Sequence, residues 1–183
     1  MENQRKSFSI MAMSCAAALV MMAGSAQAAD TAMINFSGFV VASTCTYQQT
    51  MNIPLPTVLL ADVNENGKTA GLKKFDIAFS NCPAGAKVRA DFQANPAFVD
   101  SSSGLLKNLK ENDGGAVFVN VALTDKDGNV IRVGQPRTDA PVVADNAGKA
   151  TLTYGAEYYG TGSPSLTRPG EVTAAVGFLA EYL

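Results

Sequence analysis

The sequence predicts an all-β domain in which two antiparallel sheets pack face to face. The chain contains many short runs rich in Val, Ile, Phe, Tyr and Thr, separated by clusters of Gly, Asn, Asp, Pro and Ser at intervals of about ten to twenty residues. Apolar and polar residues alternate within several of these runs, so each predicted strand has one face suited to a core. About eight such strands favour two packed sheets over one.

The N-terminal residues 1–28 predict a secretory signal peptide. Arg5 and Lys6 precede an apolar run that covers residues 8–22, and the segment ends in Ala26-Gln27-Ala28. This order of positive charge, apolar run and small residues is what signal peptidase recognises. We therefore expect the mature chain to begin at Ala29.

Cleavage after residue 28 leaves 155 of the 183 residues, the size of one domain with an adequate core. Clusters of Gly, Asn, Asp, Pro and Ser between the apolar runs divide this domain into strands. Leucines at 105, 106 and 109 suggest one helical turn over 105–110. The expected strands cover 34–43, 50–54, 72–81, 87–93, 116–124, 129–133, 150–159 and 171–182.

The cysteines predict one disulfide. Cys45 and Cys82 remain in the mature chain, and an exported chain with an even number of cysteines normally pairs them. A zinc site is the weaker alternative, because the chain has no histidine to complete a tetrahedral shell with two thiolates. Cys15 lies inside the predicted signal peptide, where the leucine of a lipoprotein signal is absent, so lipid attachment is also disfavoured.

Composition argues against catalysis and nucleic-acid binding. The formal net charge is −2, which favours neither nucleic acid nor an anionic membrane. Histidine is absent, the mature cysteines are assigned to a disulfide, and no serine lies in a nucleophile-elbow motif. We expect this protein not to be an enzyme and to have no catalytic residue, no metal and no cofactor.

The two ends of the mature chain carry the clearest alternation. One face of the first strand presents Ala32, Ile34, Phe36, Gly38, Val40 and Ala42. One face of the last strand presents Val172, Ala174, Val176, Phe178, Ala180 and Tyr182. The last strand runs almost to the C-terminus, so we expect it to be a sheet edge whose free backbone groups invite another strand.

These ends resemble the structural subunits of chaperone-usher pili of the type 1 fimbrial group. Ile34-Asn35-Phe36-Ser37-Gly38, followed by Cys45, is similar to the family's donor strand and first cysteine. The segment from Phe75 to Cys82 is similar to the strand with the second cysteine, and Gly170 with penultimate Tyr182 is similar to the family's ending. Residues 115–128, leading into Val130 and Ile131, look like its central hairpin.

The resemblance implies an incomplete immunoglobulin-like β-sandwich that lacks its last strand, with a signal peptide at 1–28, a donor strand at 29–42 and a pilin domain at 43–183. A periplasmic chaperone would first fill the groove along Gly170 to Leu183 and hold the Leu183 carboxylate. At an outer-membrane usher, the next subunit's N-terminal strand would replace it, pointing Ala32, Ile34, Phe36, Gly38 and Val40 into the groove. The implied location is the cell-surface fimbrium, reached through the periplasm, and the implied role is polymerisation that supports cell adhesion.

Simpler alternatives remain open for several features. The N-terminal alternation also suits an ordinary first strand of a closed sandwich, in which case the protein would be a self-contained exported adhesin or ligand-binding module. Asp125 to Asn129 favours a hairpin turn over a calcium loop. Tyr154, Tyr158 and Tyr159 are candidates for a sugar-binding face or for packing. The pattern fits a shaft subunit, a tip adaptor and a terminator. It weakly favours a tip adaptor, because the segment between the expected mature N-terminus at Ala29 and the donor residue Ile34 is short.

Overall fold

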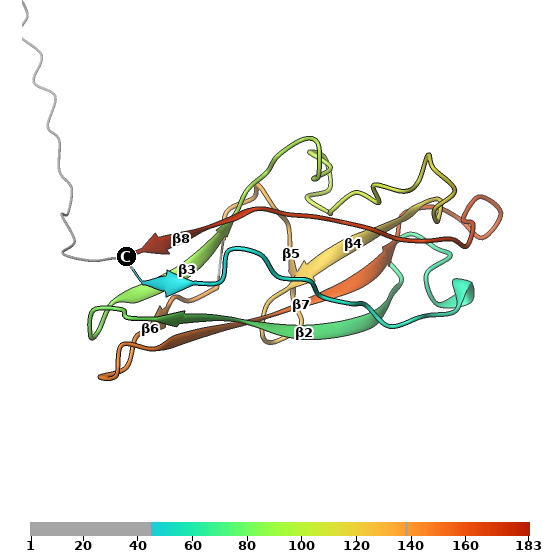
Figure 1. Ribbon diagram of the computed structural model, residues 1–183. Coiled ribbons are helices and arrows are strands. Elements are labelled where there is room, and N and C mark those ends of the chain that lie inside the picture. The colour runs from blue at the N-terminus through green and yellow to red at the C-terminus, as the bar shows by residue number, and fades with distance from the viewer. Residues whose placement is uncertain (1–44, 138) are drawn as a thin grey trace, which may run out of the picture. The chain divides into compact units, whose positions relative to one another are not determined.

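The computed structural model describes residues 45–137 and 139–183 and has two antiparallel sheets (Figure 1). The first sheet has the strand order β1-β2-β7-β4-β5, and the second has the order β6-β3-β8. The elements are β1 (Thr46–Tyr47), the 3-10 turn η1 (Leu60–Asp62), β2 (Thr69–Ser80), β3 (Lys87–Phe92), β4 (Val119–Thr124), β5 (Val130–Ile131), β6 (Val142–Val143), β7 (Ala150–Gly160) and β8 (Phe178–Tyr182).

The period of two in the sequence explains how the sheets pack. Ile77 and Phe79 of β2 are 1% and 2% exposed, whereas their neighbours Ala78 and Ser80 are exposed. In β3 the buried residues are likewise every second one. Side chains that alternate in this way place one face of each sheet against the other. The shared core includes Ile77, Phe79, Val88, Ala90, Phe92, Val121, Leu123, Leu152 and Tyr154.

Most predicted strands are confirmed, and three predictions need correction. Strands lie within or across the expected ranges 72–81, 87–93, 116–124, 129–133 and 150–159. The segment 50–54 is not a strand, the segment 105–110 forms an isolated bridge and a turn in place of a helical turn, and only Phe178–Tyr182 of 171–182 is a strand. The predicted strand 34–43 and the predicted signal peptide lie outside the described residues.

The turn between β4 and β5 is the predicted hairpin. The Asp125 N–H donates to the Asn129 carbonyl at 2.9 Å, and Gly128 adopts a φ of 91° that favours glycine. The Asp125 carboxylate accepts the N–H groups of Asp127 and Asn129, each at 2.9 Å. These hydrogen bonds hold the turn.

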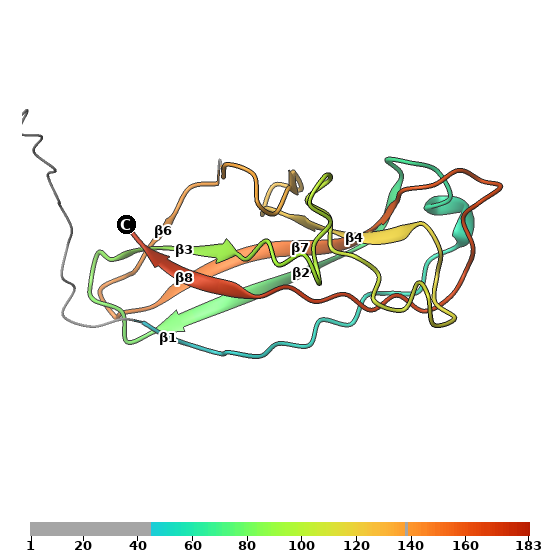
Figure 2. The same cartoon turned by 90° about the horizontal axis from the view of Figure 1, so that it is seen from above.

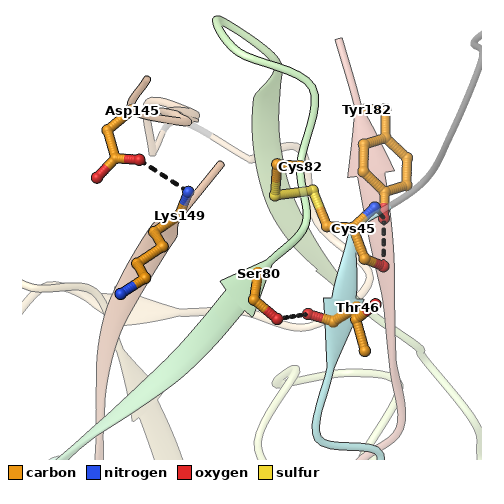
Figure 3. The surroundings of a disulfide bond; sticks show 7 residues. All are labelled: Cys45, Thr46, Ser80, Cys82, Asp145, Lys149 and Tyr182. Carbon is orange, nitrogen blue, oxygen red and sulfur yellow. Dashed lines mark hydrogen bonds between the residues drawn. A yellow bond between two sulfur atoms is a disulfide. The ribbon is translucent and has the colours of Figure 1, made fainter. Parts of the chain in front are cut away.

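The predicted disulfide between Cys45 and Cys82 is confirmed (Figure 3). It joins the start of β1 to the residues just after β2, and both cysteines are buried. Thr46, the next residue, pairs with Ser80 across the β1–β2 ladder. The covalent bond therefore reinforces a two-residue strand that has few hydrogen bonds of its own.

A tight loop follows β3 and is organised by Asp100. One carboxylate oxygen, Oδ1, accepts hydrogen bonds from the N–H groups and hydroxyls of both Ser102 and Ser103, at 2.6 to 3.0 Å. These bonds, led by the Ser102 hydroxyl, lower the pKa of Asp100 from 3.8 to about 2. The loop thus binds the ionised carboxylate more strongly than the protonated one.

Stability should depend on the ionisation of Asp100. Because folding lowers its pKa, the contribution is complete above pH 3.8 and is lost as pH falls through about 2. The loss of unfolding free energy caused by Asp100→Asn should therefore be larger at pH 6 than at pH 2, measured by urea unfolding at both pH values. An equal difference at both would contradict this account.

Candidate functional site

A long groove opens between two extended segments of the sandwich. One segment follows β1 and the other precedes β8, and Figure 2 shows both extending along the length of the domain beside β2 and β7. The groove has a volume of about 1010 Å³. Its first wall is residues 47–55 without Gln48, its second wall is residues 172–178, and its floor includes Phe75, Ile77, Phe92, Leu106, Val121, Leu123, Ala156 and Tyr158.

The second wall has the alternation expected from the sequence. The inward set packs against the core and is partly buried, whereas Thr173, Ala175, Gly177 and Leu179 between them are exposed. The inward set is Val172, Ala174, Val176, Phe178, Ala180 and Tyr182. Apolar side chains therefore line the groove along this wall, although the segment belongs to a strand only from Phe178 onward.

Both walls leave backbone groups free. Within the described part of the chain, Ala174, Ala175 and Val176 make no backbone hydrogen bond. The same holds for residues 51–55 of the first wall, apart from any bond to undescribed residues. Two rows of backbone groups without a backbone partner among the described residues therefore flank the apolar floor.

The two ends of the groove are fixed differently. At one end the Tyr182 hydroxyl accepts the Cys45 N–H at 3.0 Å, and Figure 3 shows this hydroxyl beside the Cys45 backbone. Tyr47 packs there against Phe178, with ring centroids 5.3 Å apart. At the other end Gly170 crosses Gly115 so closely that a Cβ on either residue would overlap backbone atoms. These contacts hold both ends of the second wall, whereas residues 174–176 in its middle make no backbone hydrogen bond to any residue that the structure describes.

The structure places each predicted site residue that it describes. The even-numbered residues 172–178 line the groove, whereas Ala180 and Tyr182 lie beyond it, in β8. Gly170 sits at the crossing with Gly115, and Leu183 is 58% exposed with its N–H donating to the Lys87 carbonyl at 3.1 Å. The predicted donor residues Ala32, Ile34, Phe36, Gly38 and Val40 lie outside the described residues.

The sequence reading missed the first wall of the groove. Met51, Ile53 and Leu55 are partly buried and alternate with exposed Asn52 and Pro54. The sequence predicts an ordinary strand at 50–54, because a period of two does not distinguish a strand with paired neighbours from an extended segment without them. The alternation is visible in the sequence, but only the tertiary arrangement shows that residues 51–55 form a wall of the groove.

The three tyrosines proposed as a sugar-binding face do not form one face. Tyr154 is 3% exposed in the core, and Tyr158 lines the groove. Tyr159 lines a different cavity. Successive residues of β7 point to opposite faces of the sheet, which separates Tyr158 from Tyr159.

Comparison with known proteins gives the family. The model of the fimbrial protein family matches residues 34–182. The chain belongs to this family. This fimbrial subunit is also 35% identical over 175 residues to the F17 fimbrial protein of Escherichia coli, an alignment that covers 90% of this chain and 94% of the relative.

Solved structures agree with the fold of the fimbrial subunit. A chaperone-usher pilus structure, studied for rod uncoiling, superposes with a TM-score of 0.57 at 19% identity, covering 85% of this chain and 98% of that one. A tip adhesin from Pseudomonas aeruginosa superposes with a TM-score of 0.59 at 21% identity over 77% of this chain. The subunit spans only 38% of that adhesin's length.

Membership of the fimbrial protein family gives the class, the partners and the location of the protein. The fimbrial subunit is a structural protein and not an enzyme, its partners are other pilin subunits, and its place is the surface-exposed fimbrium. Within 45–137 and 139–183, no helix is long and apolar enough to cross a membrane.

Proposed function

We propose that this subunit polymerises by donor-strand exchange, with residues 29–42 inserting into the groove of a neighbouring subunit. The observation that carries the proposal is the groove itself: an apolar floor between two walls whose backbone groups are free among the described residues. An inserted strand would pair with both walls and complete the sandwich. A self-contained adhesin would have no need of such an opening, which disfavours that alternative.

The proposed donor matches the groove in length and pattern. Seven residues, 172–178, form the second wall, and seven extended residues span about 23 Å. Residues 34–40 are also seven and alternate apolar with mostly polar side chains. Burying Ile34, Phe36 and Val40 would contribute roughly 5 to 9 kcal/mol gross, and each new backbone hydrogen bond would add about 0.5 to 1.5 kcal/mol.

Gly38 has a defined role in this scheme. It lies on the same face of the predicted strand as Ile34 and Phe36, so it would point into the groove. A residue without Cβ permits close approach of the donor to the groove floor. Ser37 lies on the opposite face and would point to solvent.

Export and assembly follow the same scheme. The predicted signal peptide 1–28 would direct the chain to the periplasm, where a chaperone would occupy the groove until an outer-membrane usher exchanges it for the next subunit's strand. Basic residues of that chaperone would hold the carboxylate of Leu183, an exposed residue that follows β8. The assembled fibre would support cell adhesion.

The test uses a variant that begins at residue 43, isolated in complex with the chaperone of the expressing strain. A synthetic peptide of residues 29–42 should displace the chaperone, seen by native electrophoresis, and raise the Tm of the released subunit by at least about 10 °C, because it completes the core.

Two peptides provide the controls. A Gly38→Leu peptide should neither displace the chaperone nor raise Tm, whereas a Ser37→Leu peptide, with the same added bulk on the opposite face, should act like the natural sequence. Equal action of both variant peptides would refute insertion in this register.

A further inference from the structure

A second cavity lies on the face of the first sheet that is turned away from the groove. It has a volume of about 780 Å³, within the range typical of small-ligand pockets. Asn120 and Tyr159 are cross-strand partners on β4 and β7 and both line it. Their neighbours Val121 and Tyr158, also partners, line the groove. Alternation along the strands therefore separates the two sites.

A partly exposed aromatic residue lines this cavity. Phe118 is 38% exposed and has a φ of 58°, a left-handed conformation that is unusual for a bulky residue. Its N–H donates to Glu111 Oε1 at 2.9 Å, and its carbonyl accepts the Thr161 N–H at 2.9 Å. Gly162 lies so close that a Cβ there would meet the Phe118 side chain at 2.7 Å. Three contacts thus maintain a strained residue with its ring at the surface.

Opposite charges line the same cavity without pairing. The Arg132 guanidinium donates to the Ser103 carbonyl at 3.0 Å and lies 5.3 Å from the centroid of the Tyr159 ring. Asp100 uses Oδ1 for all its hydrogen bonds to Ser102 and Ser103, so among the described residues Oδ2 accepts none. No ion pair within the described ranges involves either charge.

We propose that this cavity, which we call the Phe118 pocket, binds a saccharide ring. A sugar presents an apolar C–H face together with hydroxyls that both donate and accept. Phe118 would stack on the apolar face, Asp100 Oδ2 would accept from one hydroxyl, and Arg132 and Asn120 would donate to others. Each polar group is held by hydrogen bonds from the protein, so little ordering is required on binding.

The Phe118 pocket works independently of the groove. The two cavities share no lining residue and lie on opposite faces of the β4–β7 pair. A strand inserted into the groove would leave the pocket open. Every copy of the subunit in a fibre would then offer one weak saccharide site, and many weak sites act together on a surface coated with glycan.

The test applies the full mature chain, purified in the assembled form that the bacteria export, to an array of immobilised neutral and acidic oligosaccharides. The natural sequence should bind at least one oligosaccharide. For that oligosaccharide, Phe118→Ala and Arg132→Gln should each weaken the Kd by about tenfold, and Phe118→Tyr, which keeps the ring, should preserve binding.

Matched substitutions away from the pocket complete the experiment. Leu179→Ala removes a more exposed apolar side chain, and Lys149→Gln removes an exposed cation; both should bind like the natural chain. Absence of binding to every oligosaccharide would overturn the proposal. Binding that survives both Phe118→Ala and Arg132→Gln in folded protein, as checked by circular dichroism, would overturn it as well.

Discussion

Replacing Asp139 by alanine is expected to lower the free energy of unfolding by about 3 kcal/mol, the lower end of the range for breaking a buried ion pair. The Arg137–Asp139 side chains are only 12% and 14% exposed, and Arg137 Nε donates to Asp139 Oδ1 at 2.6 Å. Arg137 also lies 5.1 Å from the Phe92 ring centroid and 5.9 Å from that of Tyr154. Burial opposes its charge, but the hydrogen bonds that Arg137 donates to Asp139 and Tyr154 raise its pKa overall.

Urea unfolding of the natural and variant chains in a fixed assembly state measures the effect. The double variant Arg137→Met with Asp139→Leu should lose less than Asp139→Ala alone, because it leaves no uncompensated charge. The exposed pair Lys126–Asp127, with side chains 72% and 63% exposed, supplies the matched control, and Asp127→Ala should cost less than about 1 kcal/mol. Equal losses at positions 127 and 139 would contradict the buried-pair explanation.

Replacing both Cys45 and Cys82 by serine is expected to cost about 3 to 4 kcal/mol by the chain-entropy model. The bond closes a loop with a sequence separation of 37 and anchors the two-residue strand β1. The midpoint of urea unfolding of the double variant should fall well below that of the oxidised natural chain.

Cys15→Ser is the matched control for the disulfide. Residue 15 lies in the predicted signal peptide, so its replacement should leave the mature chain unchanged. Addition of a reductant should bring the natural chain to the stability of the double serine variant. If the oxidised natural chain and the double variant unfold at the same urea concentration, the disulfide has no stabilising role.

Local alternation was enough to predict the fold class and one wall of the groove. Runs of β-branched and other apolar residues predicted β2, β3, β4 and β7, and in β3 and the second half of β2 every second residue is buried in the core. Alternation also gave the correct inward face for residues 172–178. The same alternation predicted a last strand that is too long, 171–182 in place of Phe178–Tyr182. Alternation indicates which side chains are buried, but it does not indicate whether a neighbouring strand supplies hydrogen bonds.

The remaining features depend on contacts between distant segments. Leucines 105, 106 and 109 resembled a helical turn, but Leu106 bridges to Val99 and Val121. The Phe118 pocket combines segments near residues 66, 100, 120, 132 and 159, and no local motif marks it. The left-handed conformation of Phe118 is equally invisible in sequence, because tertiary contacts impose it against the residue's own preference.

The hydrogen bond between Tyr182 and Cys45 connects the disulfide to both walls of the groove. Cys45 is joined covalently to Cys82, which follows β2, and its backbone N–H donates to the Tyr182 hydroxyl in β8. A reduced chain would lack the covalent part of this attachment at the start of the first wall. We therefore expect reduction of this one bond to loosen the contact between the two walls, so that the redox state of the chain affects the shape of a groove lined by other residues.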